Sequence, residues 1–286
     1  MIELAFMLAL ATGSSQVQEV PPPPACRGAF ETIDWQACAD ASGQGTPGYA
    51  LAMINLGTRA YVEGDYASAL SFYDKAEQPG QSIQSDVIFH TFRGDTYRHT
   101  GREAEALADA RLAWLMLTED PSVAGDPRDR RPIDDGLRFF VLVRILGILK
   151  TGDAEIFGSA RAMFIALPVD SVEDLSNRAG ALEQLGEFDA ALVDSKRAVD
   201  LQPGNPGALN NHCYILIRAG QAERGLPYCE RAVALVPEIA PVRHSYASAL
   251  AALGRCRDAD HQLAEARRLD PSGALYRQPL VCTPKP

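Results

Sequence analysis

The chain has 286 residues, of which 47% are hydrophobic and 22% charged, with a formal net charge of -10. These totals exclude a disordered chain and allow more than one small core. The negative charge, with no basic run longer than RDRR at 128–131, argues against nucleic acid and anionic lipid as partners. Abundant Ala, Leu, Glu, Arg and Gln favours helices over sheets.

The first residues, MIELAFMLALATGSSQ, contain a short apolar run in which Ala9 and Ala11 flank Leu10. Small residues at this spacing are typical of a signal-peptidase site, so we expect a signal peptide over 1–18. Glu3 stands where positive charges are usual, and a buried helix turn or an ordered terminus is the alternative. No later apolar run is long enough to span a membrane, so the mature chain is not expected to be membrane-spanning.

Residues 19–47 form a Pro-rich, Cys-bracketed segment, with four prolines in a row at 21–24. Such a run favours an extended linker, here followed by a small cap. The chain has six cysteines, an even number that suggests three disulfides in an exported protein. Because no C-x₂-C spacing occurs and the His residues are scattered, no metal site is expected.

Three similar stretches, RAVDLQPGN, RAVALVPEI and EARRLDPSG, begin at Arg197, Arg231 and Glu265, 34 residues apart each time. A fixed period of this length is typical of stacked repeats. The clearest unit, 172–205, has Leu at place 4, Ala at places 8, 20 and 27, Gly at 15 and Pro at 32. Small residues let two antiparallel helices cross closely, Gly permits the reversal, and Pro ends the second helix.

This spacing resembles the tetratricopeptide repeat. The match predicts a solenoid over 48–286, with repeats near 50–83, 87–120, 138–171, 172–205, 206–239 and 240–273 and a capping tail at 274–286. The resemblance implies an all-α, right-handed α-solenoid of about six helical hairpins, whose first helices line a concave face. The third unit has Phe157 and Phe164 at places where small residues are usual, so its two helices should stand further apart.

In this family, places 2, 5, 6, 9, 12 and 13 of each first helix line the concave groove, where a partner peptide commonly lies. The resemblance places mostly polar, hydrogen-bonding residues there: Asn55, Asp95, Arg98, Asn177, Glu183, Asn210, Asn211, Tyr214, Arg218, His244, Ser245 and Ser248. Asn at place 6 can instead satisfy local helix contacts. The family's clamp for C-terminal carboxylates uses Lys as well as Arg, and Lys is missing from these places.

The segment 136–150, GLRFFVLVRILGILK, is apolar nearly all round and is expected to be buried on both faces. Arg138 and Arg144 interrupt it, and it is too short to cross a membrane. Either the Cys-bracketed segment or an apolar partner is expected to cover its concave side.

The repeat register also suggests disulfide partners. In a hairpin that turns near place 16, residues whose places sum to about 32 face each other, as Cys213 at place 8 and Cys229 at place 24 do. Two small buried thiols are the alternative. Cys26 and Cys38 then form a local pair in the cap. Cys256 remains to hold Cys282, which would tie the tail over the end of the stack.

No phosphate-binding loop, nucleophile elbow, H-E-x-x-H or dinucleotide fingerprint occurs. His244 with Asn210 and Tyr214 could form an acid/base cluster, but adjacent repeats bring such groups together without catalytic purpose. We therefore predict a non-enzymatic interaction scaffold, without cofactor, that binds a protein or peptide in its groove and is periplasmic or secreted. The alternative is a structural or self-associating component of a cell-envelope complex.

Overall fold

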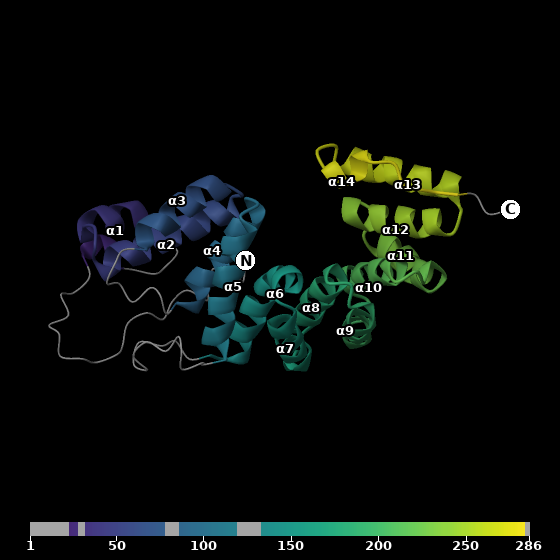
Figure 1. Cartoon of the computed structure of the whole chain (residues 1–286). Coiled ribbons are helices and arrows are strands. Elements are labelled where there is room, and N and C mark those ends of the chain that lie inside the picture. The colour runs from purple at the N-terminus through teal and green to yellow at the C-terminus, as the bar shows by residue number, and fades with distance from the viewer. Residues whose placement is uncertain (1–22, 28–31, 78–85, 119–132, 284–286) are drawn as a thin grey trace. The chain divides into compact units, whose positions relative to one another are not determined.

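The computed structural model describes residues 23–27, 32–77, 86–118 and 133–283 (Figure 1). The expected signal peptide over 1–18 lies outside the described residues. Where the chain is described, it forms helices and no strand. It divides into two compact units, Met1–Leu167 and Pro168–Pro286, called here unit 1 and unit 2.

Unit 1 holds the N-terminal cap and the first three hairpins. Its described elements are η2 (Pro24–Cys26), α1 (Trp35–Ser42), α2 (Pro47–Val62), α3 (Tyr66–Ala76), α4 (Val87–His99), α5 (Glu103–Leu117), α6 (Asp135–Gly152) and α7 (Ala154–Ala166). The hairpins are α2/α3, α4/α5 and α6/α7, and each stacks on the next through α3 with α4 and α5 with α6.

Unit 2 holds the last three hairpins and the tail. Its described elements are α8 (Val172–Gln184), α9 (Phe188–Leu201), α10 (Pro206–Arg218), α11 (Ala222–Leu235), α12 (Ala240–Ala252), α13 (Cys256–Leu269) and α14 (Ala274–Arg277). The hairpins α8/α9, α10/α11 and α12/α13 stack in chain order. The described chain thus contains the six helical hairpins of the predicted all-α solenoid.

Polar residues cap the N-terminal ends of the helices, and glycines lie in the turns between paired helices. Side chains that accept hydrogen bonds from first-turn N–H groups are those of Asp34, Thr46, Asp65, Asp86, Asp134, Asp153, Ser171 and Asn205. At place 15 of five units, Gly64, Gly101, Gly186, Gly220 and Gly254 have φ between 75° and 81°. This left-handed conformation strains any residue with a Cβ, so the repeated Gly fixes where the second helix begins.

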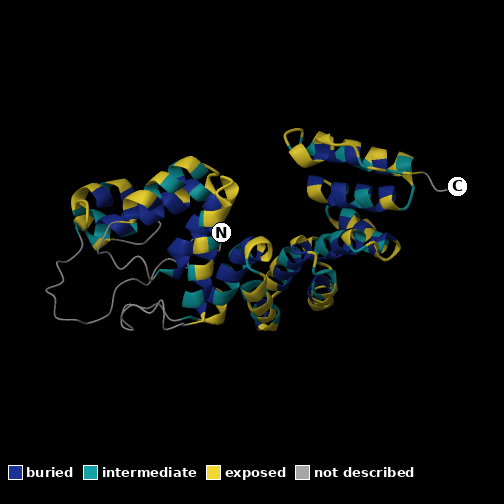
Figure 2. Cartoon of the chain, viewed as in Figure 1, coloured by how far each residue is buried: buried dark blue, intermediate teal, exposed yellow. Residues whose placement is uncertain are grey.

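Small residues let the helices of each hairpin meet. A Cβ added to Gly225 would lie 3.1 Å from the Cys213 carbonyl oxygen, and one added to Gly94 would lie 3.0 Å from the Cβ of Asp109. Buried residues line the facing sides of the paired helices (Figure 2). The exception is α6/α7, whose helices approach less closely than those of the other hairpins, because Phe164 is fully buried where Ala is usual.

The apolar segment 136–150 lies within α6 and is buried by helices of its own unit. α6 packs against α4, α5 and α7, and Val141, Leu142, Ile145 and Leu149 are fully buried. The described part of the Cys-bracketed segment lies elsewhere, since α1 packs against α2. Among the described residues, the Cys-bracketed segment therefore does not cover α6. The helices of the neighbouring hairpin already fill that role.

All six cysteines pair as expected, Cys26 with Cys38, Cys213 with Cys229, and Cys256 with Cys282. The Cys213–Cys229 bridge joins α10 to α11 across the crossing, with the two Cα atoms 5.5 Å apart. The alternative of two buried thiols at this crossing is thus excluded.

Candidate functional site

The polar residues of α8 and α10 form one continuous set, called here the α8–α10 face: Asn177, Glu183, Asn210, Asn211, Tyr214 and Arg218. The Asn211 amide nitrogen donates to the Ser176 carbonyl oxygen at 3.0 Å, which ties α10 to α8. Asn211, at place 6 of its repeat, therefore uses its amide for a contact within the protein. Asn177, at the same place of the preceding repeat, is exposed.

The far end of the α8–α10 face carries its charges. The Arg218 guanidinium lies 3.1 Å from the buried Glu183 carboxylate across the two helices and donates to the Tyr214 hydroxyl at 3.3 Å. Half of the Arg218 side chain is exposed. The Asn210 side-chain oxygen is shielded from solvent, and no donor from the described residues reaches it. The face therefore exposes a cation, at Arg218, and contains a shielded acceptor that lacks a donor, at Asn210.

An open cleft of about 480 Å³ adjoins this face where α8 and α10 begin. Its lining is polar or small for the most part and consists of Ser171, Val172, Glu173, Ser176, Gln202, Asn205, Gly207 and Ala208. Ser176 belongs to both the cleft lining and the Asn211 hydrogen bond. The cleft and the face are thus neighbouring parts of one surface of unit 2.

The candidates on α12 are satisfied within the protein. His244 and Ser245 are buried. The Ser245 hydroxyl donates to the Pro241 carbonyl oxygen at 3.1 Å, and the Ser248 hydroxyl donates to the His244 carbonyl oxygen at 2.9 Å. The His244 ring packs 5.5 Å from that of Tyr276, and burial lowers the pKa of His244. The structure therefore leaves the side chains of α12 little capacity to bind a ligand.

The candidates in unit 1 are likewise engaged. Asn55 is buried and donates to the Leu51 carbonyl oxygen at 2.8 Å. The buried Asp95 carboxylate accepts from the Tyr61 hydroxyl at 2.5 Å and from Arg98 Nε at 2.7 Å. Burial and the Asp95 charge together raise the pKa of Tyr61. The predicted groove residues thus fall into two groups, one in each unit. In unit 1 the Asn55 oxygen also lacks a donor among the described residues, but Asn55 is buried, whereas the α8–α10 face includes the exposed Asn177.

The sequence analysis missed two buried ion pairs. Arg178 Nε and Nη2 donate to the two carboxylate oxygens of Asp194 at 2.6 and 2.9 Å. Arg93 binds Asp109 in the same way at 2.7 and 2.8 Å. Burial alone would raise the pKa of Asp109, but its bonds from Arg93 and His90 outweigh that effect and lower the pKa.

Both pairs occupy places 7 and 23 of their repeats, where they join the first helix to the second. This recurrence of Arg and Asp at one spacing is the signal by which the pairs could have been found. Their role is structural, because both partners of each pair are buried and bond to each other inside the protein. Arg93 also donates to Glu77, and Asp109 is also hydrogen-bonded to His90.

The structure offers little that suggests other chemistry. Among the described residues, no three His, Cys, Asp or Glu side chains gather as metal ligands would. None of the described helices combines the length and apolar character that a membrane crossing needs.

No known family profile matches the chain, and no curated protein sequence does. Solved structures do match. A tetratricopeptide repeat protein from Parabacteroides merdae is similar over 85% of this chain and 87% of its own, with 14% identity and a TM-score of 0.56. PilW, a type IV pilus biogenesis factor, is similar over 80% of this chain and 96% of its own, with 18% identity and a TM-score of 0.51. The chain therefore has the tetratricopeptide-repeat fold that its sequence resembles.

Proposed function

We propose that the chain is a non-enzymatic protein-interaction scaffold and that the α8–α10 face holds an extended peptide segment. The observation that carries this proposal is the unsatisfied Asn210 oxygen, which lies on the same face as the exposed Asn177 and the half-exposed Arg218. A buried acceptor without a donor is costly. A backbone N–H group of a bound peptide would supply the donor once the half-buried Asn210 side chain turns towards the ligand.

The chemistry of the face suits a peptide backbone rather than a reacting group. Asn side chains both donate and accept, as peptide groups do, so Asn177 and Asn210 can pair with an extended strand. Glu183 partly offsets the charge of Arg218, at a separation of 3.1 Å. The cleft beside Ser176 gives room for a side chain of the ligand.

The disulfides support a place outside the reducing cytosol. All six cysteines are paired, and such bridges persist in oxidising compartments. We therefore propose that the protein works in the periplasm or after secretion. The alternative of end-to-end self-association is disfavoured at the C-terminal end, where Tyr276 of the tail is packed into the core of the last hairpin.

The test is selection of peptides from a random library against the disulfide-bonded chain, followed by affinity measurement for one selected peptide. The double variant Asn177→Ala, Asn210→Ala should bind about 5- to 150-fold more weakly, because two lost hydrogen bonds remove about 1–3 kcal/mol. Lys196→Ala, an exposed change on α9, is the matched control and should bind as the natural chain does. Equal affinity for all three chains would place the binding surface elsewhere.

A further inference from the structure

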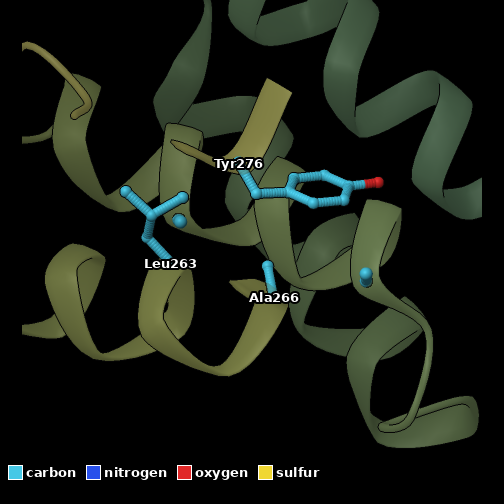
Figure 3. Close-up of a cluster of buried hydrophobic side chains, with 5 residues drawn as sticks. Leu263, Ala266 and Tyr276 are labelled. Atoms are coloured by element: carbon cyan, nitrogen blue, oxygen red, sulfur yellow. The ribbon is translucent and has the colours of Figure 1, made fainter. Parts of the chain in front are cut away.

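The C-terminal tail packs over the last hairpin as a cap. Tyr276 in α14 is 7% exposed and packs against Leu263 and Ala266 of α13 (Figure 3). Ala240 and Ala247 of α12 belong to the same buried cluster. Without Tyr276, these four small or branched side chains would lose their cover at the end of the stack.

Polar bonds hold the backbone of this cap. Arg267 of α13 donates from Nε to the Tyr276 carbonyl oxygen at 2.6 Å and from Nη2 to the Arg277 carbonyl oxygen at 3.3 Å. Leu280 adds a partly buried contact to the same cluster. Leu280 and Cys282 also pack against the buried cluster of Leu250, Ala251 and Ala259. The Cys256–Cys282 bond adds a covalent link between the tail and α13.

The three disulfides differ in their access to solvent. Cys213 and Cys229 are 0% and 1% exposed. In the third bridge Cys38 is 1% exposed, whereas its partner Cys26 is half-buried. Cys256 and Cys282 are both half-buried, and Val281, next to Cys282, is 94% exposed. A thiol in solution can therefore approach Cys282 from the side of the tail, whereas the α10–α11 bridge is closed to it.

The position of Cys256 favours it as the leaving group. It is the first residue of α13, and the positive end of a helix stabilises a thiolate there. The neighbouring charges of Arg255 and Asp258 pair with each other at 2.8 Å, so neither opposes this effect strongly. A thiolate that is more stable leaves faster in thiol–disulfide exchange.

We propose that the Cys256–Cys282 bond is a thiol–disulfide exchange site for a dithiol reductant and that its reduction releases the tail. A thiolate of the dithiol attacks Cys282 Sγ, the Cys256–Cys282 bond breaks, and Cys256 leaves as a thiolate. The second thiol of the reductant, as its thiolate, then attacks the reductant's own sulfur in the mixed disulfide. This step releases the Cys282 thiolate. The dithiol becomes a disulfide, two electrons pass to the protein, and protons from the reductant or water convert the new thiolates to thiols.

The first test follows the reduction itself. The whole chain is treated under native conditions with increasing dithiothreitol, quenched with iodoacetamide and analysed by peptide mass spectrometry. Cys256 and Cys282 should be alkylated at a dithiothreitol concentration at least tenfold below that for Cys213 and Cys229, with the helical circular dichroism retained. The proposal fails if the bridges open together, or if Cys26–Cys38 opens first.

The second test follows the release of the tail and needs no ligand. Reduction should increase trypsin cleavage after Arg277 several-fold and raise the fluorescence of a hydrophobic dye. The Cys256→Ser, Cys282→Ser double variant should show both properties before reduction and little further change after it. The matched variant Cys26→Ser, Cys38→Ser should behave as the natural chain does. If the tail stays protected after both of its thiols are alkylated, the Arg267 and Tyr276 contacts hold it alone and the release is refuted.

Discussion

Unit 1 and unit 2 build the same hairpins but surround their groove positions with different side chains. In unit 1, Asp95 lies among aromatic rings, and Tyr61 packs 5.1 Å from Phe92 while Tyr66 stacks on His99 at 4.4 Å. In unit 2, Glu183 and Arg218 lie beside the amides of the α8–α10 face. Aromatic rings close on one another, whereas amides keep donors and acceptors available. The repeat pattern sets the backbone, and these few side chains decide whether a face can bind.

The largest effect is expected where the two units are alike, at the buried ion pairs. Asp194→Ala in unit 2 should lower the free energy of unfolding by about 3–5 kcal/mol, because it removes the carboxylate to which two nitrogens of the buried Arg178 donate. Asp109→Ala in unit 1 should cost somewhat less, because Arg93 keeps its bond to Glu77. Urea unfolding measures this loss. Asp200→Ala, which breaks the exposed Lys196–Asp200 pair, should cost far less, because solvent screens that pair. Similar losses for all three variants would contradict the buried-pair account.

The second largest effect is expected at the α10/α11 hairpin of unit 2, whose two helices are joined by a disulfide. The Cys213–Cys229 bridge closes a loop with a sequence separation of 16 residues. Replacing both cysteines with Ala should therefore lower the free energy of unfolding by about 3 kcal/mol. The small side chains keep the crossing intact, so native circular dichroism should not change. A double variant as stable as the natural chain would show that the crossing is held by packing alone.

Acid should affect unit 2 before unit 1. Burial, together with the charges of Lys196 and Arg224, lowers the pKa of His212 to about 4. Below about pH 6.5 the unfolded chain binds a proton at His212 that the folded chain does not yet bind. The free energy of unfolding therefore falls as the pH is lowered from about 6.5 to 4. The expected loss from pH 7 to pH 5 is about 2 kcal/mol.

In unit 1 the pKa of Asp109 is lowered. The stability that its ionised carboxylate contributes is therefore lost only below about pH 4. Urea unfolding at several pH values tests the difference, and His212→Asn should flatten the loss above pH 5. An unchanged slope in this variant would assign the acid response to another group.

The smallest effect compares two hydroxyl groups. Tyr61→Phe removes a donor to the buried Asp95 and should cost about 1–2 kcal/mol. Tyr214→Phe removes a long, exposed bond of 3.3 Å and should cost under about 0.5 kcal/mol. Thermal unfolding of the two variants measures both. Equal losses would mean that the polar groups of the α8–α10 face are as tightly engaged as those of unit 1.

The hairpins and disulfide partners were predictable because they follow from spacing. Gly at place 15 and small residues at the crossings fix the helix pairs, and places 8 and 24 bring Cys213 and Cys229 together. The state of the groove was not predictable, because a place in a repeat does not tell whether a side chain has a partner. Asn55 and Asn177 share a place, yet Asn55 is buried and Asn177 is exposed.

Which elements cover α6 was not predictable for a related reason. Its apolar surface indicated that something must cover it, but periodicity cannot say which element does so. The structure gives this role to α4, α5 and α7. The Arg–Asp pairs at places 7 and 23 were missed because single charged residues on helices are usually exposed, and only their recurrence marks them as partners.

The most direct test of the account is the footprint of a library-selected peptide on the isotopically labelled, oxidised chain, observed by nuclear magnetic resonance. We expect the largest shifts at amides of α8 and α10, including the side-chain amides of Asn177 and Asn210. Shifts centred on α2 and α4 around Asp95, with the α8–α10 face unchanged, would contradict it.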